Sequence, residues 1–278
     1  MRRVLVTGAG GFLGRAVVAA LEERGAQVAA AGHDAPLGVD FRLADAVEEL
    51  FAEVRPDAVV HLAGTSRAAD HGRGPEDVRT ENVVHPLLNT LEHCAGRRVV
   101  MVSSAAVYGT GATDEGAPLR PNGLWAAAKA SAEVLGRRRA AALRATFVVA
   151  RPFFLLGPGA PRRSEIGGWI AAGQKADQID VHGADVPRDL LDVRDAAAGI
   201  CELVLLGADG LAYNLAAETS MATSSLLHLL VPSVRVGFDG RAREPFHGSA
   251  PGLRALGWAP RVPVEVTLRD TLAAAGPR

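Results

Sequence analysis

Three glycines at three-residue spacing, Gly8, Gly11 and Gly14, place the strongest constraint on how this chain can fold. They follow a short β-branched run over Val4 to Thr7 and lead into apolar residues at helical spacing from Phe12 to Arg24. A glycine turn between a strand and a helix lets the backbone approach a pyrophosphate at the helix N-terminus. The pattern therefore predicts a dinucleotide-binding turn, with a plain tight βα turn as the alternative.

The chain continues as an alternation of strands and helices. Further strands are expected over 27–31, 57–62, 98–102, 145–150 and 212–215, and helices over 46–54, 76–94, around 125–129 and over 193–206. This alternation predicts an α/β fold, a doubly wound parallel sheet of the Rossmann type with right-handed crossovers. We expect a dinucleotide-binding domain over 1–157, and a smaller substrate-binding region over 158–278 that folds back onto it.

Composition excludes several classes of protein. The formal net charge of -1 provides no bulk field for nucleic acid, and no stretch approaches the roughly 20 apolar residues of a membrane span. Cys94 and Cys201 form no C-x-x-C pair, which favours free thiols in a reducing compartment. The histidines show no metal-ligand spacing. We expect a cytoplasmic protein without a metal and without nucleic-acid or membrane partners.

The end of the second strand reports on the cofactor. Rossmann-type domains that bind NAD place an acidic residue there to accept a hydrogen bond from the ribose 2′-OH. Here Gly32 and His33 occupy that position, although Asp34 follows at once. His33 or Arg15 could meet a 2′-phosphate, and we therefore favour NADP(H) over NAD(H).

Three segments together carry a family resemblance. They are TGAGGFLG over 7–14, SSAAVYG over 103–109, and WAAAK from Trp125 to Lys129. In this order they resemble the extended short-chain dehydrogenase/reductase family, whose third motif is Y-x-x-x-K. Trp125 replaces the tyrosine. A phenol can release its proton with a pKa of about 10, whereas an indole N–H can only donate a hydrogen bond.

The resemblance implies roles for individual residues. Ser104 would donate to a substrate carbonyl oxygen, Lys129 would bind the nicotinamide ribose, and Trp125 would form an aromatic wall at the catalytic site. Asp40 and Phe41 resemble the pair that flanks the adenine. The cofactor-binding residues it implies are Gly8, Gly10, Gly11, Phe12, Leu13, Gly14, Arg15, Gly32, His33, Asp40, Phe41, Leu62, Ala63, Gly64, Lys129, Pro152 and Phe153.

Departures from the family pattern bear on the substrate. Phe154 replaces an asparagine that, with an arginine matched by Arg188, helps sugar-nucleotide enzymes to hold the nucleotide. Trp125, Phe153 and Phe154 instead suggest an apolar, aromatic-lined pocket. The chain thus resembles the tailoring ketoreductases of aromatic polyketide antibiotic biosynthesis. A nucleotide-sugar 4-ketoreductase or epimerase, and a non-catalytic NADP-binding regulator, are the alternatives.

The missing tyrosine leaves the proton donor open. Tyr108 belongs to a segment that is usually structural, and His71, in a loop expected at the rim of the site, is an alternative donor. A phenolic substrate could protonate its own alkoxide, since its acidity is similar to that of the missing side chain. We expect an aromatic, apolar small-molecule substrate with possible substrate-assisted protonation; a homodimer is possible.

Overall fold

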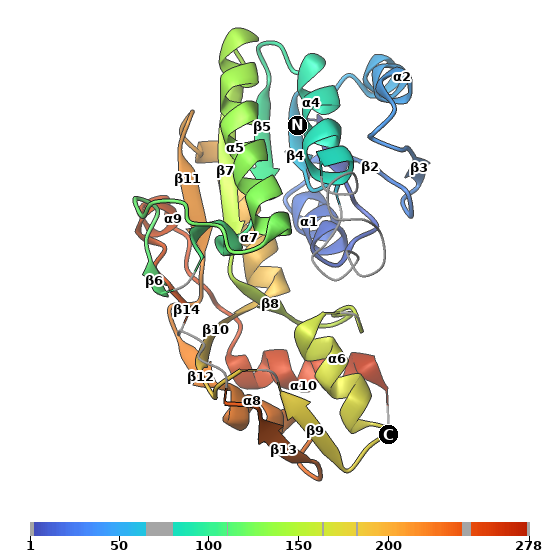
Figure 1. Cartoon of the computed structure of the whole chain (residues 1–278). Helices are drawn as coiled ribbons and strands as arrows, with labels where there is room; N and C mark the ends of the chain where they lie inside the picture. The colour runs from blue at the N-terminus through green and yellow to red at the C-terminus, as the bar shows by residue number, and fades with distance from the viewer. Residues whose placement is uncertain are drawn as a thin grey trace.

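The computed structural model describes residues 3–64, 80–109, 111–162, 164–181, 183–240 and 246–276. Within these residues the largest element is a seven-stranded sheet in which every neighbouring pair is parallel (Figure 1). From edge to edge it consists of β11 (Ala212–Leu215), β7 (Thr146–Pro152), β5 (Arg98–Val102), β4 (Ala58–His61), β1 (Arg3–Thr7), β2 (Gln27–Gly32) and β3 (Leu37–Gly38).

Helices cover both faces of this sheet. On one face lie α1 (Phe12–Glu23) and α7 (Val193–Leu206), and on the other lie α2 (Ala44–Val54), α4 (His85–Glu92) and α5 (Leu124–Ala142). The strands are covered on both faces because their apolar side chains alternate between the two faces of the sheet. In β1, Val4 and Val6 pack in the core with α1 and α7, and Leu5 packs in the core with α2, α4 and α5. The predicted doubly wound Rossmann fold is confirmed.

A second group of elements lies beyond the carboxyl ends of the strands (Figure 1). It contains β6 (Gly111–Thr113), β8 (Phe154–Leu156), β10 (Pro187–Asp192), β12 (Ser220–Ala222) and β14 (Phe246–Gly248), the parallel pair β9 (Gln178–Val181) and β13 (Arg235–Phe238), and the helices α6 (Glu165–Gly173), α8 (Thr223–Leu230) and α10 (Val264–Ala275). A separate apolar cluster holds it together, including Trp169, Leu226 and Leu268. No helix in the described part of the chain has the length and apolar character needed to cross a bilayer.

The two groups of elements do not follow one linear boundary. Helix α7, strand β11 and the short helix α9 (Pro251–Ala255) come from beyond residue 157, yet they pack into the core of the Rossmann sheet. Three elements that follow residue 157 in the chain thus complete the Rossmann sheet and its helical layer, and the division into domains at residue 157 remains a prediction.

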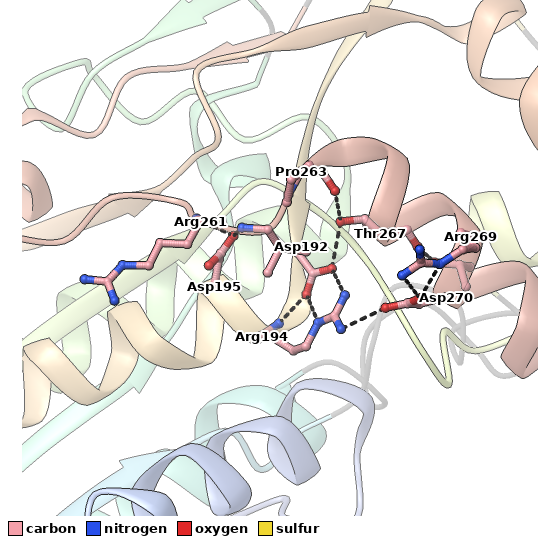
Figure 2. A network of polar contacts seen from close by, with 10 residues as sticks. Asp192, Arg194, Asp195, Arg261, Pro263, Thr267, Arg269 and Asp270 are labelled. Atoms are coloured by element: carbon pink, nitrogen blue, oxygen red, sulfur yellow. Dashed lines mark hydrogen bonds and ion pairs between the residues drawn. The ribbon is translucent and has the colours of Figure 1, made fainter.

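A polar network ties α7 to the C-terminal helix (Figure 2). Asp192 caps α7 by accepting from the Arg194 N–H, and its Oδ2 accepts from Thr267 Oγ1 of α10 at 2.7 Å. Asp195 accepts from the backbone N–H of Arg261 at 2.9 Å. These carboxylates therefore fix α10 against the end of β10.

The helix expected over 76–94 departs from the sequence prediction. Residues 76–79 lie outside the described residues, and a π-helical turn η2 (Thr80–Val84) precedes α4. Pro86 lies in the first turn of α4, where its missing N–H costs nothing. A continuous α-helix would place this proline in its interior, where the ring clashes with the preceding turn.

Candidate functional site

The glycine turn after β1 leaves no room for side chains. A Cβ on Gly8 would lie 2.8 Å from the Leu62 carbonyl carbon, and a Cβ on Gly14 would lie 2.2 Å from the Gly8 carbonyl oxygen. Gly8 has a φ of 65°, a conformation that favours glycine. The turn thus brings β1, α1 and the end of β4 together, and its shape fits the close approach of a pyrophosphate.

The first turn of α1 presents its N-terminus beside that glycine turn. Gly11 is the N-terminal cap, and Phe12 and Leu13 begin the helix without an acidic side chain. Free backbone N–H groups at this end favour an anion. Arg15 turns back, and its Nη1 donates to the Gly10 carbonyl oxygen at 2.5 Å.

The end of β4 forms the wall next to the glycine turn. Thr7 Oγ1 accepts from the N–H groups of Leu62 at 3.1 Å and Ala63 at 2.9 Å, and lies 3.2 Å from His61 Nδ1. Burial lowers the pKa of His61 to about 3, with a further contribution from the charge of Lys129. His61 is therefore a neutral core residue that fixes the strand end. Gly64 continues this wall with a φ of 137°.

Lys129 lies at the centre of the site, on α5. It is buried, and its Nζ donates to the Val102 carbonyl oxygen at 3.1 Å, at the end of β5. Burial lowers the pKa of Lys129 to about 8, and Glu133 on the next turn partly offsets this effect. Trp125, one turn earlier, has its ring centre 6.0 Å from Nζ. The ammonium group of Lys129 thus lies between the end of β5 and an indole.

Ser104 follows β5 directly and caps the short helix η3 (Ala105–Tyr108). Its Oγ accepts from the Ala106 N–H at 3.1 Å, and the hydroxyl proton has no acceptor among the described residues. Ser104 is half-buried, so this proton can be donated to a bound carbonyl oxygen. The structure therefore brings Ser104 and Lys129 to one strand end.

A buried network lies beneath this pair, and sequence reasoning missed it. Glu133 accepts from Ser103 Oγ at 2.6 Å and forms a two-point ion pair with Arg151, the shorter contact being 2.5 Å. Arg151 donates to the Tyr108 hydroxyl at 2.7 Å, and Tyr108 donates to Asn214 at 2.8 Å. Burial raises the pKa of Tyr108. Tyr108 is therefore structural, as the sequence indicates.

Besides Tyr108, the chain has one further tyrosine, Tyr213, and one further candidate proton donor, His71. Tyr213 is buried, and its hydroxyl accepts from the Ala208 N–H at 3.0 Å. His71 lies outside the described residues. Among the residues that the structure describes, no group of three or more His, Cys, Asp or Glu side chains could hold a metal ion.

The aromatic residues after β7 have different environments. Pro152 and Phe153 are buried, and the Phe153 ring lies in the main core against Gly248. The Phe153 N–H donates to the Leu215 carbonyl oxygen, which holds this segment against β11, and the expected lining of a pocket by the Phe153 ring remains a prediction. The cofactor contact expected of Pro152 and Phe153 remains a prediction.

Phe154 belongs to a cluster around Arg188. The guanidinium of Arg188 lies 4.8 Å from the Phe154 ring centre and 5.1 Å from that of Trp169. It also forms a two-point ion pair with Glu165, at 3.0 and 3.1 Å, and donates to Thr223 at 3.0 Å. Arg188 is only 2% exposed. Its charge is therefore neutralised and covered by aromatic rings.

Arg42 lies beside Asp40 on the adenosine side of the site, and it is not among the residues predicted from the sequence. Asp40 follows β3, and its carboxylate pairs with Arg42, with a shortest contact of 2.5 Å. The hydrogen bond from Arg42 is the main reason why the pKa of Asp40 is lowered. Only the two-residue spacing could have pointed to this pair.

Comparisons with known proteins agree with this fold. The strand order, glycine turn and lysine define a dinucleotide-binding protein of the Rossmann class. A sequence profile of the NAD dependent epimerase/dehydratase family matches residues 4–216, so the chain belongs to this family, as the three motifs predict.

Individual relatives cover nearly the whole chain. GDP-6-deoxy-D-mannose reductase from Pseudomonas aeruginosa is 28% identical over 98% of this chain and 96% of its own length. The structure of RMD from Pseudomonas aeruginosa complexed with NADPH has a TM-score of 0.87 and 28% identity, covering 99% and 97% of the two chains. The UDP-glucose 4-epimerase of Thermus thermophilus, solved with NAD, has a TM-score of 0.84 and 25% identity, covering 98% of each chain.

Proposed function

We propose that the protein is an NADPH-dependent ketoreductase that reduces a carbonyl of an aromatic, polyketide-like compound. The observation that carries this proposal is the arrangement at the end of β5. There Ser104 has a hydroxyl proton to donate, and the Lys129 ammonium is anchored to Val102. A carbonyl oxygen placed at Ser104 would gain a hydrogen bond as negative charge develops on it.

The cofactor side of the proposal rests on shape and charge. The glycine turn at Gly8 and Gly14 would receive the pyrophosphate, and Lys129 would donate to the nicotinamide ribose. When bound, NADPH supplies the hydride that reduces the carbonyl carbon. The residues of the chain then have to orient the ketone, and one proton has to reach the oxygen atom that becomes the alcohol.

That proton has few possible sources in this site. The Trp125 indole cannot act as an acid, Tyr108 and Tyr213 are engaged in the core, and Lys129 is assigned to the ribose. We assign the proton to a phenol of the substrate beside the carbonyl, which is held in position by the substrate itself. An O-methylated analogue that still binds should be reduced more slowly. Equal rates would refute this assignment and direct attention to His71.

The substrate class is supported by Arg188. In sugar-nucleotide enzymes the matching arginine helps to hold the nucleotide, but here Glu165 neutralises it, and Phe154 and Trp169 cover it. An uncharged aromatic compound suits this surface better than a nucleoside diphosphate, because a phosphate needs an accessible cation.

A second candidate is a nucleotide-sugar 4-ketoreductase or epimerase. The similarity to GDP-6-deoxy-D-mannose reductase over nearly the whole chain favours it. The experiment that decides is to follow NADPH oxidation with aromatic polyketide ketones and with nucleotide-linked 4-ketosugars. Our proposal predicts turnover with the first panel only. Turnover with the ketosugars would establish the second candidate, and binding of NADPH without turnover of either panel would indicate a non-catalytic regulator.

A further inference from the structure

The backbone after β2 passes directly beside the glycine turn. A Cβ on Gly10 would lie 2.3 Å from the Asp34 carbonyl oxygen, and a Cβ on Gly32 would lie 3.3 Å from the Gly8 Cα. In this fold the adenosine ribose lies between the glycine turn and the end of the second strand. Groups that gather at this point therefore face the ribose 2′ position.

Two basic side chains and one acid form a cluster there. His33 is the first exposed side chain after β2, and the charges of both Arg42 and His33 help to lower the pKa of Asp40. Asp34, also exposed, is the other acid at this bend. The backbone brings these groups together, because the Val39 N–H donates to the Gly32 carbonyl oxygen at 3.3 Å and so places Asp40 and Arg42 beside the bend that carries His33.

The geometry of the pair directs Arg42 outward. Its Nε donates to Asp40 Oδ1 at 2.9 Å and its Nη2 donates to Oδ2 at 2.5 Å. Both contacts use one edge of the guanidinium, so Nη1 has no partner among the described residues. The side chain is 47% exposed. One edge is therefore fixed by the carboxylate, and the remaining donors are available to an anion.

The segment that carries Arg42 is itself held rigidly. Asn89 of α4 donates from Nδ2 to the carbonyl oxygens of Phe41 at 3.0 Å and Arg42 at 3.1 Å. Phe41 is buried, with its ring edge-on to His61. The backbone at Arg42 is thus anchored to the core, which reduces the cost of ordering this arginine around a ligand.

The other arginine near this point, Arg15, has different contacts. Arg15 donates to Gly10, and its Nη2 lies 3.4 Å from the position of a Cβ on Gly159, in the loop after β8. Arg15 thus lies between the glycine turn and that loop, and an Arg15→Ala variant separates its contribution from that of Arg42.

We propose that Arg42, oriented by Asp40 and assisted by His33, is the anion site for the 2′-phosphate of NADP(H). The inference rests on the cofactor class of the proposed function and adds the residue that selects between the two dinucleotides. A guanidinium fork matches the oxygens of a phosphate, whereas the 2′-OH of NAD(H) offers it no charge.

Binding of two cofactor fragments by calorimetry tests this without any turnover. The probes are adenosine 2′,5′-bisphosphate and 5′-AMP. The unmodified protein should bind the bisphosphate more tightly. Arg42→Ala should weaken bisphosphate binding about tenfold or more, as expected for loss of a hydrogen bond to a charged group, and change 5′-AMP binding by about twofold or less. The matched control is Arg139→Ala, because Arg139 forms the same two-point pair with Glu92 on α4, and it should change neither affinity.

Three results would overturn the proposal. They are equal affinities of the unmodified protein for the two probes, an unchanged ratio in Arg42→Ala, and loss of the preference in Arg15→Ala with retention in Arg42→Ala. The reductase proposal can fail separately. Selective bisphosphate binding without reduction of any ketone would refute the ketoreductase proposal but support the phosphate site at Arg42. Equal use of NADPH and NADH in ketone reduction would support the ketoreductase proposal but refute the phosphate site.

Discussion

The ammonium nitrogen of Lys129 lies 6.0 Å from the centre of the Trp125 ring. The two residues are one turn apart on α5 and so face the same side of the helix. The family resemblance places a titratable phenol where this indole stands. The site thus retains the positive charge that we assign to the ribose, but has beside it an aromatic group that cannot release a proton.

If Trp125 is an aromatic wall, Trp125→Phe should retain turnover within about tenfold of the unmodified protein, since loss of a general acid costs about 10²–10⁴-fold. Steady-state kinetics with NADPH and the reactive ketone measure this. Trp125→Tyr need not be faster, because the substrate pose does not depend on a phenol there. Abolished turnover with intact ketone binding in Trp125→Phe would show that the indole N–H is essential.

The charge of Lys129 should make turnover sensitive to alkaline pH. Burial lowers its pKa from 10.5 to about 8, so the ammonium is lost as pH rises through about 8. The profile of kcat/KM, which reports the free enzyme, should fall above that pH, with circular dichroism confirming that the fold persists. A flat profile to about pH 10, the ordinary range of a lysine, would show that this charge is not needed, or that it persists to higher pH.

The ion pair beneath the site should dominate local stability. Glu133→Ala leaves Arg151 buried without its counter-ion, which should cost on the order of 3–5 kcal/mol in urea unfolding. Glu92→Ala removes the exposed partner of Arg139 and should cost about 1 kcal/mol or less. Similar costs for the two variants would mean that the buried pair contributes no more than a surface pair.

Gly14→Ala should impair the glycine turn. The new Cβ would lie 2.2 Å from the Gly8 carbonyl oxygen, so the turn must shift, and NADPH binding measured by calorimetry should weaken about tenfold or more. Gly168→Ala in α6 is the control. Its Cβ would make only an ordinary 3.6 Å contact, and alanine should stabilise the helix by about 0.5–1 kcal/mol. Unchanged NADPH binding in Gly14→Ala would place the pyrophosphate elsewhere.

Regular elements could be predicted closely from the sequence where one local signal decides them. Helix α7 has the predicted bounds 193–206, since apolar residues at helical spacing follow the capping Asp192. Strand β11 also matches its predicted bounds, 212–215. The helix around Pro86 is interrupted because a single proline outweighs the periodicity on both sides of it.

The site could be predicted only as far as its motifs extend. Ser104 and Lys129 both lie at the end of β5, because each motif fixes its place on an element. The burial of the Phe153 ring and the position of Arg42 beside the end of β2 depend instead on contacts between distant segments. Spacing along the chain carries no information about these contacts.

Deuterium transfer tests the central claim most directly. NADPH labelled with deuterium at the transferred position of the nicotinamide is incubated with the protein and an aromatic polyketide ketone that has a phenol beside the carbonyl. We predict an alcohol with deuterium on the former carbonyl carbon, one for each NADPH oxidised. Transfer of the label only to a nucleotide-linked ketosugar, or to no ketone although NADPH is bound, would contradict the account.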